Sequence, residues 1–320
     1  MLLICGGYEG VLIGLDYDPE KLKSLKIPEN PSSDGPSEHE EINGQNKPFT
    51  QLFRLLCSQG SIKCMDLHSN VLVCGGSDET VQVYNIEKST KHGEIMLPEG
   101  YITSVAVFGG VNKGSVLVGN EYGEISLFLT RDLSFQKSFK GHKKEISGLS
   151  FHSEGKAFIS VGLDCYLRLW DLNSKTCIFN TKLNFTPLSV KWSNGSKYIL
   201  SSENQVFVCS SEDDTFQTIK SLPNDKVICC SWYADSAVVV GFKSGLVSIH
   251  NVDTHGDSDK GSVLASSKLH NKRVKSVVAK NGYIFSGDSE GTVICCKLID
   301  EKLLPIWKHD IGFRLNVLVS

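Results

Sequence analysis

One strand–turn–strand pattern recurs seven times along the chain, and it constrains the fold more than any other feature of the sequence. In each copy a short apolar strand ends in small residues, a polar turn follows, and a second apolar strand begins. The second strands end at residues 14, 84, 128, 170, 209, 250 and 296, so five of the six intervals are 39 to 46 residues long. This period is close to the ~40–45 residues of a blade built from four strands. The sequence therefore predicts an all-β fold in which residues 1–320 form a single seven-bladed β-propeller.

The first interval, of 70 residues, exceeds one blade by about 28 residues. The excess comes from residues 18–48, which are rich in Pro, Ser and acidic residues and show no apolar periodicity. Such a segment buries too little apolar surface to offset the entropy that ordering would cost. We predict that residues 18–48 are a disordered acidic insertion between the third and fourth strands of the first blade. Residues 253–262 are predicted to be a short flexible loop at the same connection of the sixth blade.

The two ends of the sequence complement each other. The first apolar strand, near residues 2–4, fits the second strand of a blade, so the first blade lacks its first strand. Residues 313–319 are an apolar strand that no further blade follows. We expect this C-terminal strand to complete the N-terminal blade by pairing with the sheet that contains residues 2–14. Such pairing closes the ring and leaves no open sheet edge.

The fourth blade carries the signature of a WD repeat most completely, with Gly141-His142 near its start and Trp170-Asp171 at the end of its third strand. In WD repeats such residues form a hydrogen-bonded structural chain across the blade. We therefore predict a structural tetrad of His142, Ser160, Asp164 and Trp170. The alternative is a Ser-His-Asp hydrolase triad, but Ser160 lacks the G-x-S-x-G elbow that exposes a nucleophile. Other residues stand at the tryptophan position of the remaining blades that can be compared: Tyr84, Phe128, Cys209, His250 and Cys296.

The sequence shows no other catalytic or cofactor-binding signal. It contains neither G-x-x-x-x-G-K-[ST] nor H-E-x-x-H. Residues 6–10 are rich in glycine, but they lead from one predicted strand to another and not into a helix, so they predict a turn and not a phosphate site. The eleven cysteines include no C-x-x-C pair, which argues against a zinc or dithiol site. We predict that the chain is not an enzyme and binds no cofactor or metal.

Charge and hydropathy limit the kinds of partner. The net charge is −3 and the isoelectric point is near 6.3, so nucleic acid or anionic lipid would need a local basic patch. The apolar runs have the length of strands, and no membrane span is expected. No signal peptide is apparent at the start of the sequence, so the cysteines are expected to be buried thiols in a reducing compartment.

Two basic loops are the candidate partner-binding site. Loops that join the fourth strand of one blade to the first strand of the next lie at one end of a propeller, where partners commonly bind. We expect an anionic partner there, such as RNA phosphate or an acidic protein tail. The alternative is that these side chains only keep the loops hydrated. The candidate residues are Lys137, Lys140, Lys143 and Lys144 around the first loop and Lys268, Lys272, Arg273 and Lys275 around the second.

A set of motifs in the same order along nearly the whole chain resembles the p21-activated-kinase-interacting protein 1 family. It includes Gly7-Tyr8-Glu9, Gly76-Ser77-Asp78-Glu79-Thr80, His142-Lys143 and residues 270–275. A yeast relative in this family is an assembly factor for the large ribosomal subunit. The resemblance implies a non-catalytic scaffold in the nucleolus or nucleus, with the cytoplasm as an alternative, that binds pre-ribosomal proteins and ribosomal RNA. For animals it also implies inhibition of p21-activated kinases. We expect a monomer that does not bind membranes.

Other functions remain open at this stage. One alternative is a regulator that docks on a kinase, and another is a generic protein-docking propeller. A third is a substrate receptor of a cullin-type ubiquitin ligase, but the W-D-x-R motif of such receptors ends here in Asn173. The sequence also departs from the family, because residues 18–48 are longer than expected and a lysine-rich C-terminal tail is absent.

Overall fold

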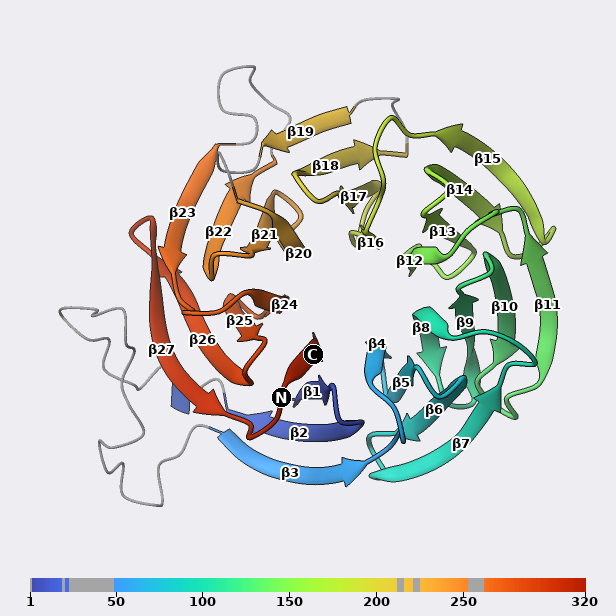
Figure 1. Ribbon diagram of the computed structural model, residues 1–320, viewed down its shortest axis with the longest axis horizontal. Helices are drawn as coiled ribbons and strands as arrows, with labels where there is room; N and C mark the ends of the chain where they lie inside the picture. Colours follow the sequence, from blue (N-terminus) through green and yellow to red (C-terminus); the bar gives the residue numbers. More distant parts are fainter. Residues whose placement is uncertain (1, 19–20, 23–48, 212–215, 221–224, 253–261) are drawn as a thin grey trace. The chain divides into compact units, whose positions relative to one another are not determined.

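The computed structural model describes residues 1–320 apart from 1, 19–20, 23–48, 212–215, 221–224 and 253–261 (Figure 1). The described residues form seven four-stranded sheets. In six of the sheets the four strands are consecutive in the chain, and in the seventh the last strand joins the first three. These sheets are the blades of a seven-bladed β-propeller, so the fold predicted from the repeat is confirmed.

The chain divides into two compact units, and residues 1–56 with 217–320 form the first. This unit contains three whole blades. The strands of the first blade, in sheet order, are β28 (Leu315–Val319), β1 (Leu2–Gly7), β2 (Val11–Tyr17) and β3 (Phe49–Leu56). The next blade is β20 (Val227–Ala234), β21 (Ala237–Phe242), β22 (Leu246–Asn251) and β23 (Val263–Lys268). The third is β24 (Val274–Lys280), β25 (Tyr283–Asp288), β26 (Thr292–Ile299) and β27 (Lys302–Asp310).

Residues 57–216 form the second unit, and the strands of its first two blades are β4 (Ile62–His68), β5 (Val71–Gly76), β6 (Thr80–Asn85), β7 (Thr90–Met96), β8 (Ile102–Gly110), β9 (Lys113–Asn120), β10 (Glu124–Leu129) and β11 (Phe135–Lys140). Two more blades follow, with the strands β12 (Ile146–Phe151), β13 (Ala157–Gly162), β14 (Tyr166–Asp171), β15 (Thr176–Lys182), β16 (Ser189–Trp192), β17 (Lys197–Ser201), β18 (Gln205–Ser210) and β19 (Phe216–Lys220). The last of these strands, β19, extends past the end of the unit.

The C-terminal strand completes the N-terminal blade, as the sequence predicts. Strand β28 pairs antiparallel with β1, with Val319 opposite Ile4 and Leu315 opposite Gly7. Gly7 is required here, because a Cβ atom at this position would lie 2.3 Å from the ring of Phe313. Both ends of the chain are thus hydrogen-bonded into one sheet, in which β1 has no free edge.

Burial follows the position of a strand in its blade. The second strands β21 and β25 are buried along their whole length, whereas the fourth strand β15 is mostly exposed. Blades within each unit pack face to face, as when β8 packs against β4 and β5, or β24 against β20 and β21. A strand covered on both faces needs apolar side chains at consecutive positions, which explains runs such as Val238, Val239 and Val240.

A polar contact links the first strands of successive blades at a recurring spacing. The Val107 amide donates to Asp66 Oδ2 at 2.7 Å over a separation of 41 residues. The Trp192 amide donates to Ser150 Oγ at 2.9 Å, over 42 residues, and Leu318 donates in the same way to Ser276 Oγ at 3.0 Å. Burial raises the pKa of the Asp66 carboxyl. One side-chain acceptor per contact therefore satisfies a strand-edge amide that the blade's own ladder leaves unpaired.

The predicted insertions lie largely outside the described residues. Residues 18–48 connect β2 to β3, the third and fourth strands of the first blade in sheet order. Within this segment Leu22 is buried in the core beside Tyr17 and Phe49, and its amide donates to Asp18 O at 3.0 Å. Residues 253–261 lie between β22 and β23. Disorder in both segments stays a prediction.

Candidate docking surface

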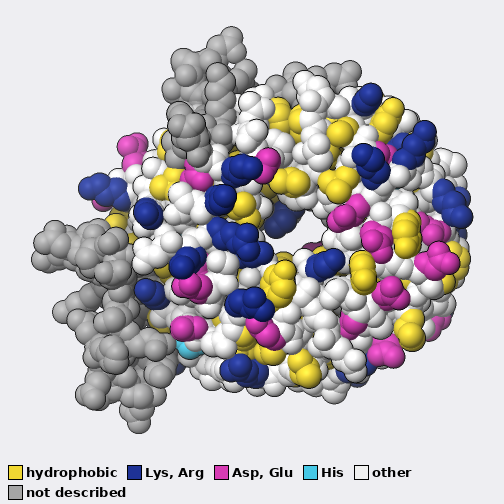
Figure 2. Space-filling model, viewed as in Figure 1, with side chains coloured by type: hydrophobic (Ala, Val, Ile, Leu, Met, Phe, Trp, Pro, Cys, Tyr) yellow, Lys and Arg dark blue, Asp and Glu magenta, His cyan; other side chains and the backbone are white. Residues whose placement is uncertain are grey.

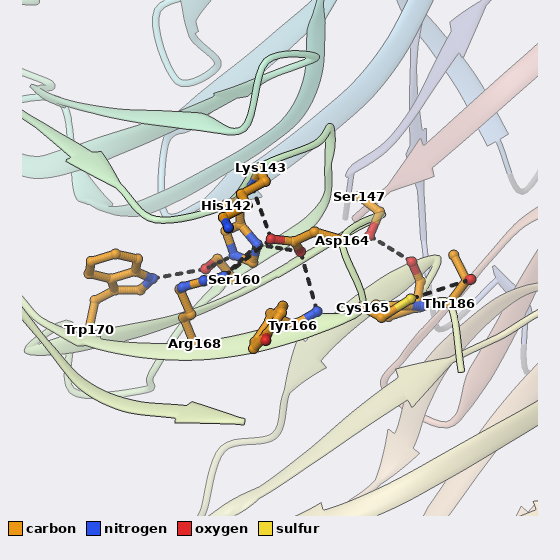
Figure 3. Close-up of polar contacts among 11 residues, drawn as sticks. His142, Lys143, Ser147, Ser160, Asp164, Cys165, Tyr166, Arg168, Trp170 and Thr186 are labelled. Atoms are coloured by element: carbon orange, nitrogen blue, oxygen red, sulfur yellow. Dashed lines mark hydrogen bonds and ion pairs between the residues drawn. The ribbon is translucent and has the colours of Figure 1, made fainter. Parts of the chain in front are cut away.

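The predicted tetrad is a continuous hydrogen-bonded chain in the blade β12–β15 (Figure 3). Trp170 Nε1 donates to Ser160 Oγ at 2.8 Å, and Ser160 Oγ lies 2.8 Å from His142 Nε2. His142 Nδ1 lies 2.9 Å from Asp164 Oδ1. The consistent arrangement has the serine hydroxyl donating to Nε2 and Nδ1–H donating to the carboxylate. The chain thus crosses from strand β14 through β13 to the loop before β12.

Arg168 adds a fifth polar group to this chain. Its Nη1 lies 2.9 Å from His142 Nδ1 and 3.5 Å from Asp164 Oδ2. Because Nδ1 already carries the proton donated to Asp164, it cannot also accept one from the guanidinium. The favourable contact of Arg168 is therefore with the Asp164 carboxylate, and its charge disfavours a second proton on His142.

The ionisation of the chain follows from these contacts. Burial lowers the pKa of His142, against the raising effect of its hydrogen bond to Asp164, so the imidazole is held neutral. Burial acts to raise the pKa of Asp164, but hydrogen bonds from His142 and from the Lys143 amide outweigh it, and the pKa is lowered. A neutral histidine and an ionised aspartate match the donor arrangement of the chain.

Ser160 lies inside the blade, on strand β13. It is 0% exposed, and its oxygen contacts both the Trp170 indole and the His142 ring. A nucleophilic serine needs a reacting carbon within about 3 Å of its oxygen. The geometry therefore favours the structural interpretation of the tetrad over the hydrolase alternative.

A second chain of the same kind, which sequence reasoning missed, lies in the blade β24–β27. His270 Nε2 lies 2.8 Å from Ser286 Oγ, and His270 Nδ1 lies 3.1 Å from Asp288 Oδ2. Burial acts to raise the pKa of Asp288, but the hydrogen bond from His270 and those from the Thr292 and Glu290 amides together outweigh it, and the pKa is lowered. The signal was present in the sequence, with His and Ser 16 residues apart instead of the 18 found for His142 and Ser160.

The first group of predicted basic residues does not act as one surface. Lys140, Lys143 and Lys144 are exposed at the end of β11 and in the loop to β12. Lys137 is turned away, since its Nζ donates to Lys175 O at 2.7 Å, in the turn between β14 and β15 at the far end of that blade. An antiparallel strand pair also sets Glu124 opposite Lys140. Three of the four lysines therefore remain candidates for contact with a partner.

The second group stays together in the first unit. Lys268, Lys272 and Arg273 are exposed around the loop from β23 to β24, and Lys275 is half-buried on β24. Lys272 Nζ forms a surface ion pair with Glu290 Oε1 at 3.0 Å. The first group belongs to the second unit, so convergence of the two groups on one rim stays a prediction.

Sequence reasoning missed two residues that belong with the second group. Lys275 Nζ lies 5.9 Å from the centre of the Tyr8 ring, and the Arg314 guanidinium lies 4.8 Å from it. Tyr8 comes from the turn after β1, and Arg314 directly precedes β28. The pairing of the chain ends brings them to β24. Figure 2 shows Lys and Arg side chains gathering over the strands of this unit.

Other kinds of site have little support in the part of the chain that the structure describes. No group of three or more His, Cys, Asp and Glu side chains there could hold a metal ion. No described helix combines the length and the apolar character needed to cross a membrane. All eleven cysteines are free thiols, six of them buried and Cys177 exposed.

Comparison with known proteins supports the fold and the resemblance to the p21-activated-kinase-interacting protein 1 family. The model of the WD domain, G-beta repeat, matches residues 133–171, which contain the tetrad. A p21-activated protein kinase-interacting protein 1-like protein of Gallus gallus is 26% identical over 99% of this chain and 75% of its own length. Protein MAK11 of Saccharomyces cerevisiae is 22% identical over 90% of this chain and 78% of its own length.

A solved structure extends the comparison to three dimensions. The structure of U3-55K covers 81% of this chain and 85% of its own with a TM-score of 0.71 and 14% identity. At this identity the likeness concerns the fold alone. The resemblance to the p21-activated-kinase-interacting protein 1 family, first found in short motifs, is confirmed by the matches over most of the chain.

Proposed function

We propose that this chain, a WD-repeat β-propeller related to the p21-activated protein kinase-interacting protein 1-like proteins, is a non-enzymatic docking scaffold for assembly of the large ribosomal subunit. The observation that carries the proposal is similarity to this family along 99% of the chain, since the family resemblance implies that role. The proposed place of action is the nucleolus or nucleus. The proposed partners are pre-ribosomal proteins and ribosomal RNA, and the chain acts as a monomer.

The non-enzymatic part of the proposal is supported by the state of the polar chains. Both serines, Ser160 and Ser286, are 0% exposed and contact a buried histidine. Groups that satisfy one another inside a blade stabilise the blade and leave no reactive atom for a substrate. Absence of ester or phosphate hydrolysis by the purified protein is the expected result. Hydrolysis that Ser160→Ala removed from a folded protein would refute this part of the proposal.

The docking part is supported by exposed basic residues at two blade junctions. Lys143 and Lys144 precede β12, and Lys272 and Arg273 precede β24. Loops between blades carry no ladder hydrogen bonds, so they tolerate the side chains that a partner requires. In a chain of net charge −3, such local positive charge selects anionic partners.

Sucrose-gradient sedimentation of nuclear extracts tests this proposal directly. The tagged protein should travel with large-subunit precursors and dissociate from them as the salt concentration rises. Affinity purification followed by mass spectrometry should recover large-subunit assembly factors. A protein that stays at the top of the gradient under low salt, with no pre-ribosomal protein recovered, would contradict the proposal.

A second candidate function is regulation of a p21-activated kinase. The observation that favours it is the similarity to the Gallus gallus p21-activated protein kinase-interacting protein 1-like protein. The discriminating experiment is a pull-down with the purified regulatory segment of such a kinase, followed by an assay of kinase activity. Kinase binding without co-sedimentation would favour this second candidate, and co-sedimentation without kinase binding would favour the first.

A further inference from the structure

Tyr8 is an exposed aromatic ring with two cationic side chains near it. It lies in the turn between β1 and β2, and 47% of its surface is exposed. The Arg314 guanidinium lies 4.8 Å from the ring centre and Lys275 Nζ lies 5.9 Å from it. Both distances are within the range of cation–π attraction. A large exposed ring held in this way is an apolar surface with a defined orientation, next to positively charged side chains.

The residues around Tyr8 carry an excess of positive charge. Arg314 Nε pairs with Glu9 Oε1 at 2.9 Å, which fixes the guanidinium beside the ring. Burial lowers the pKa of Lys275, and the neighbouring charge of Arg273 lowers it further, so like charges are crowded here. No described acidic side chain lies within ion-pair distance of Arg273 or Lys275. We define the Tyr8 surface as Tyr8, Lys272, Arg273, Lys275 and Arg314.

We propose that the Tyr8 surface binds single-stranded RNA, with a base stacked on Tyr8 and the neighbouring phosphates held by Arg273, Lys275 and Arg314. Positive charge combined with an exposed aromatic ring is the combination that single-stranded nucleic acids require. An acidic protein tail would use the charges but not the ring. A duplex keeps its bases stacked on one another, so they cannot reach Tyr8. The identity of the RNA as ribosomal rests on the proposed function above, but the binding chemistry does not.

The topology explains why this surface exists as a unit. The Tyr8 amide donates to Arg314 O at 2.8 Å, which extends the pairing of the chain ends. The Leu318 amide donates to Ser276 Oγ on β24, next to Lys275. Three segments far apart in the sequence are thus fixed to one another by hydrogen bonds from backbone amides. Preorganised side chains lose less entropy on binding than flexible ones.

Binding of a fluorescein-labelled single strand of about twelve uridines, measured by anisotropy, tests the proposal. Tyr8→Ala should weaken binding about 5- to 150-fold, the loss of one stacked base. Tyr8→Phe keeps the ring and should bind within about twofold of the wild type. The matched control is Tyr122→Ala, which removes a tyrosine that is even more exposed than Tyr8 and follows Glu121 in the turn between β9 and β10. This control should leave binding unchanged.

The salt dependence separates stacking from charge. Tyr8→Ala should leave the slope of log affinity against log salt unchanged, whereas Arg273→Ala should reduce it by about 0.7, the contribution of one phosphate contact to a single strand. Both positions are exposed, so the variants should melt like the wild type. A variant that keeps its melting temperature but loses binding reports on the surface itself.

Three results would overturn the inference. The first is that Tyr8→Ala and Tyr122→Ala bind the single strand equally well. The second is that the wild type binds duplex RNA as tightly as the single strand. The third is that polyglutamate displaces the RNA and binds the wild type and Tyr8→Ala with equal affinity. Any of them leaves the proposed function intact if the wild type still co-sediments with pre-ribosomes. Conversely, Tyr8-dependent RNA binding without co-sedimentation would support this inference and refute the proposed function.

Discussion

In the blade β12–β15 and in the blade β24–β27, a buried histidine links a serine to an aspartate, but the surroundings differ. In the first blade Trp170 donates to the serine, and Arg168 lies beside the histidine and the aspartate. In the second blade strand register places Cys296 and Ile294 at the corresponding positions. Both are buried and apolar.

The two blades share some residues of the hydrogen-bonded chain and differ at the positions around it. The common part is His, Ser and Asp, with the histidine in the loop before the first strand. The aspartate is less fixed in sequence, because it lies 22 residues after His142 but 18 residues after His270. Its carboxylate nevertheless reaches the same ring nitrogen. The surrounding positions can be polar or apolar, provided that the buried groups remain satisfied.

The largest expected difference between the blades is at the tryptophan position. Trp170→Ala should lower the free energy of unfolding by about 3–5 kcal/mol, the cost of emptying a large buried site. Cys296→Ala removes one heavy atom and should cost about 1 kcal/mol. Urea titrations of both variants measure the difference. Equal losses would show that the two blades do not differ in the way described.

Removal of the histidine should affect the two blades alike. His142→Ala and His270→Ala each leave a buried serine and aspartate without one partner, so each should cost about 1–3 kcal/mol. The control is His152→Ala, at a half-buried position in the turn after β12, which should cost less than about 1 kcal/mol. A large loss in one blade only would mean that the His–Ser–Asp chain is not the shared element.

Acid should reduce the stabilising contributions of His142 and Asp288 at different stages. The pKa of His142 is lowered from 6.5, so below this pH the unfolded chain binds a proton that the folded chain rejects, and stability falls. The pKa of Asp288 is lowered from 3.8, so its contribution is present above that pH and is lost as the pH falls through its folded value.

Unfolding curves at several pH values check these directions. His142→Gln should flatten the decline that begins near pH 6.5, and Asp288→Asn should flatten only the decline below about pH 3.8. The opposite assignment, in which Asp288→Asn removes the decline near neutral pH, would contradict the ionisation states given for these chains.

The smallest expected effect is at Arg168. An apolar side chain already occupies the corresponding position in the other blade, as Ile294. Asp164 keeps its hydrogen bonds to His142 and to the Lys143 amide without Arg168. Arg168→Ile should therefore change the stability by no more than about 1 kcal/mol. A loss as large as that of Trp170→Ala would show that the arginine is an essential part of the chain.

The sequence was sufficient for the features that repeat. Periodic apolar strands predicted the seven blades, and the WD signature predicted all four members of the tetrad. The hydrogen-bonded chain through His270 was missed because its His–Ser spacing differs from that in the tetrad and because Cys296 replaces the tryptophan. The direction of the Lys137 side chain could not be predicted either, because it depends on a hydrogen bond to a carbonyl 38 residues away.

The Tyr8 surface was beyond local sequence patterns for a different reason. Its members come from both ends of the chain and from β24, and only the pairing of β1 with β28 brings them together. The closing strand itself was predicted, but which side chains it would place side by side was not. Such contacts depend on register and side-chain direction, which periodicity does not determine.

The buried hydrogen-bonded chains are expected to stabilise the blades, while the exposed basic residues are expected to bind the partner. Two variants, compared by sedimentation with pre-ribosomes on parallel gradients, test this division of roles. One is Ser160→Ala, and the other reverses Lys143, Lys144, Lys272 and Arg273 to Glu. With both proteins folded, Ser160→Ala should stay with the pre-ribosomes and the charge-reversed variant should leave them. Continued co-sedimentation of the charge-reversed variant, or loss of a folded Ser160→Ala, would contradict the account.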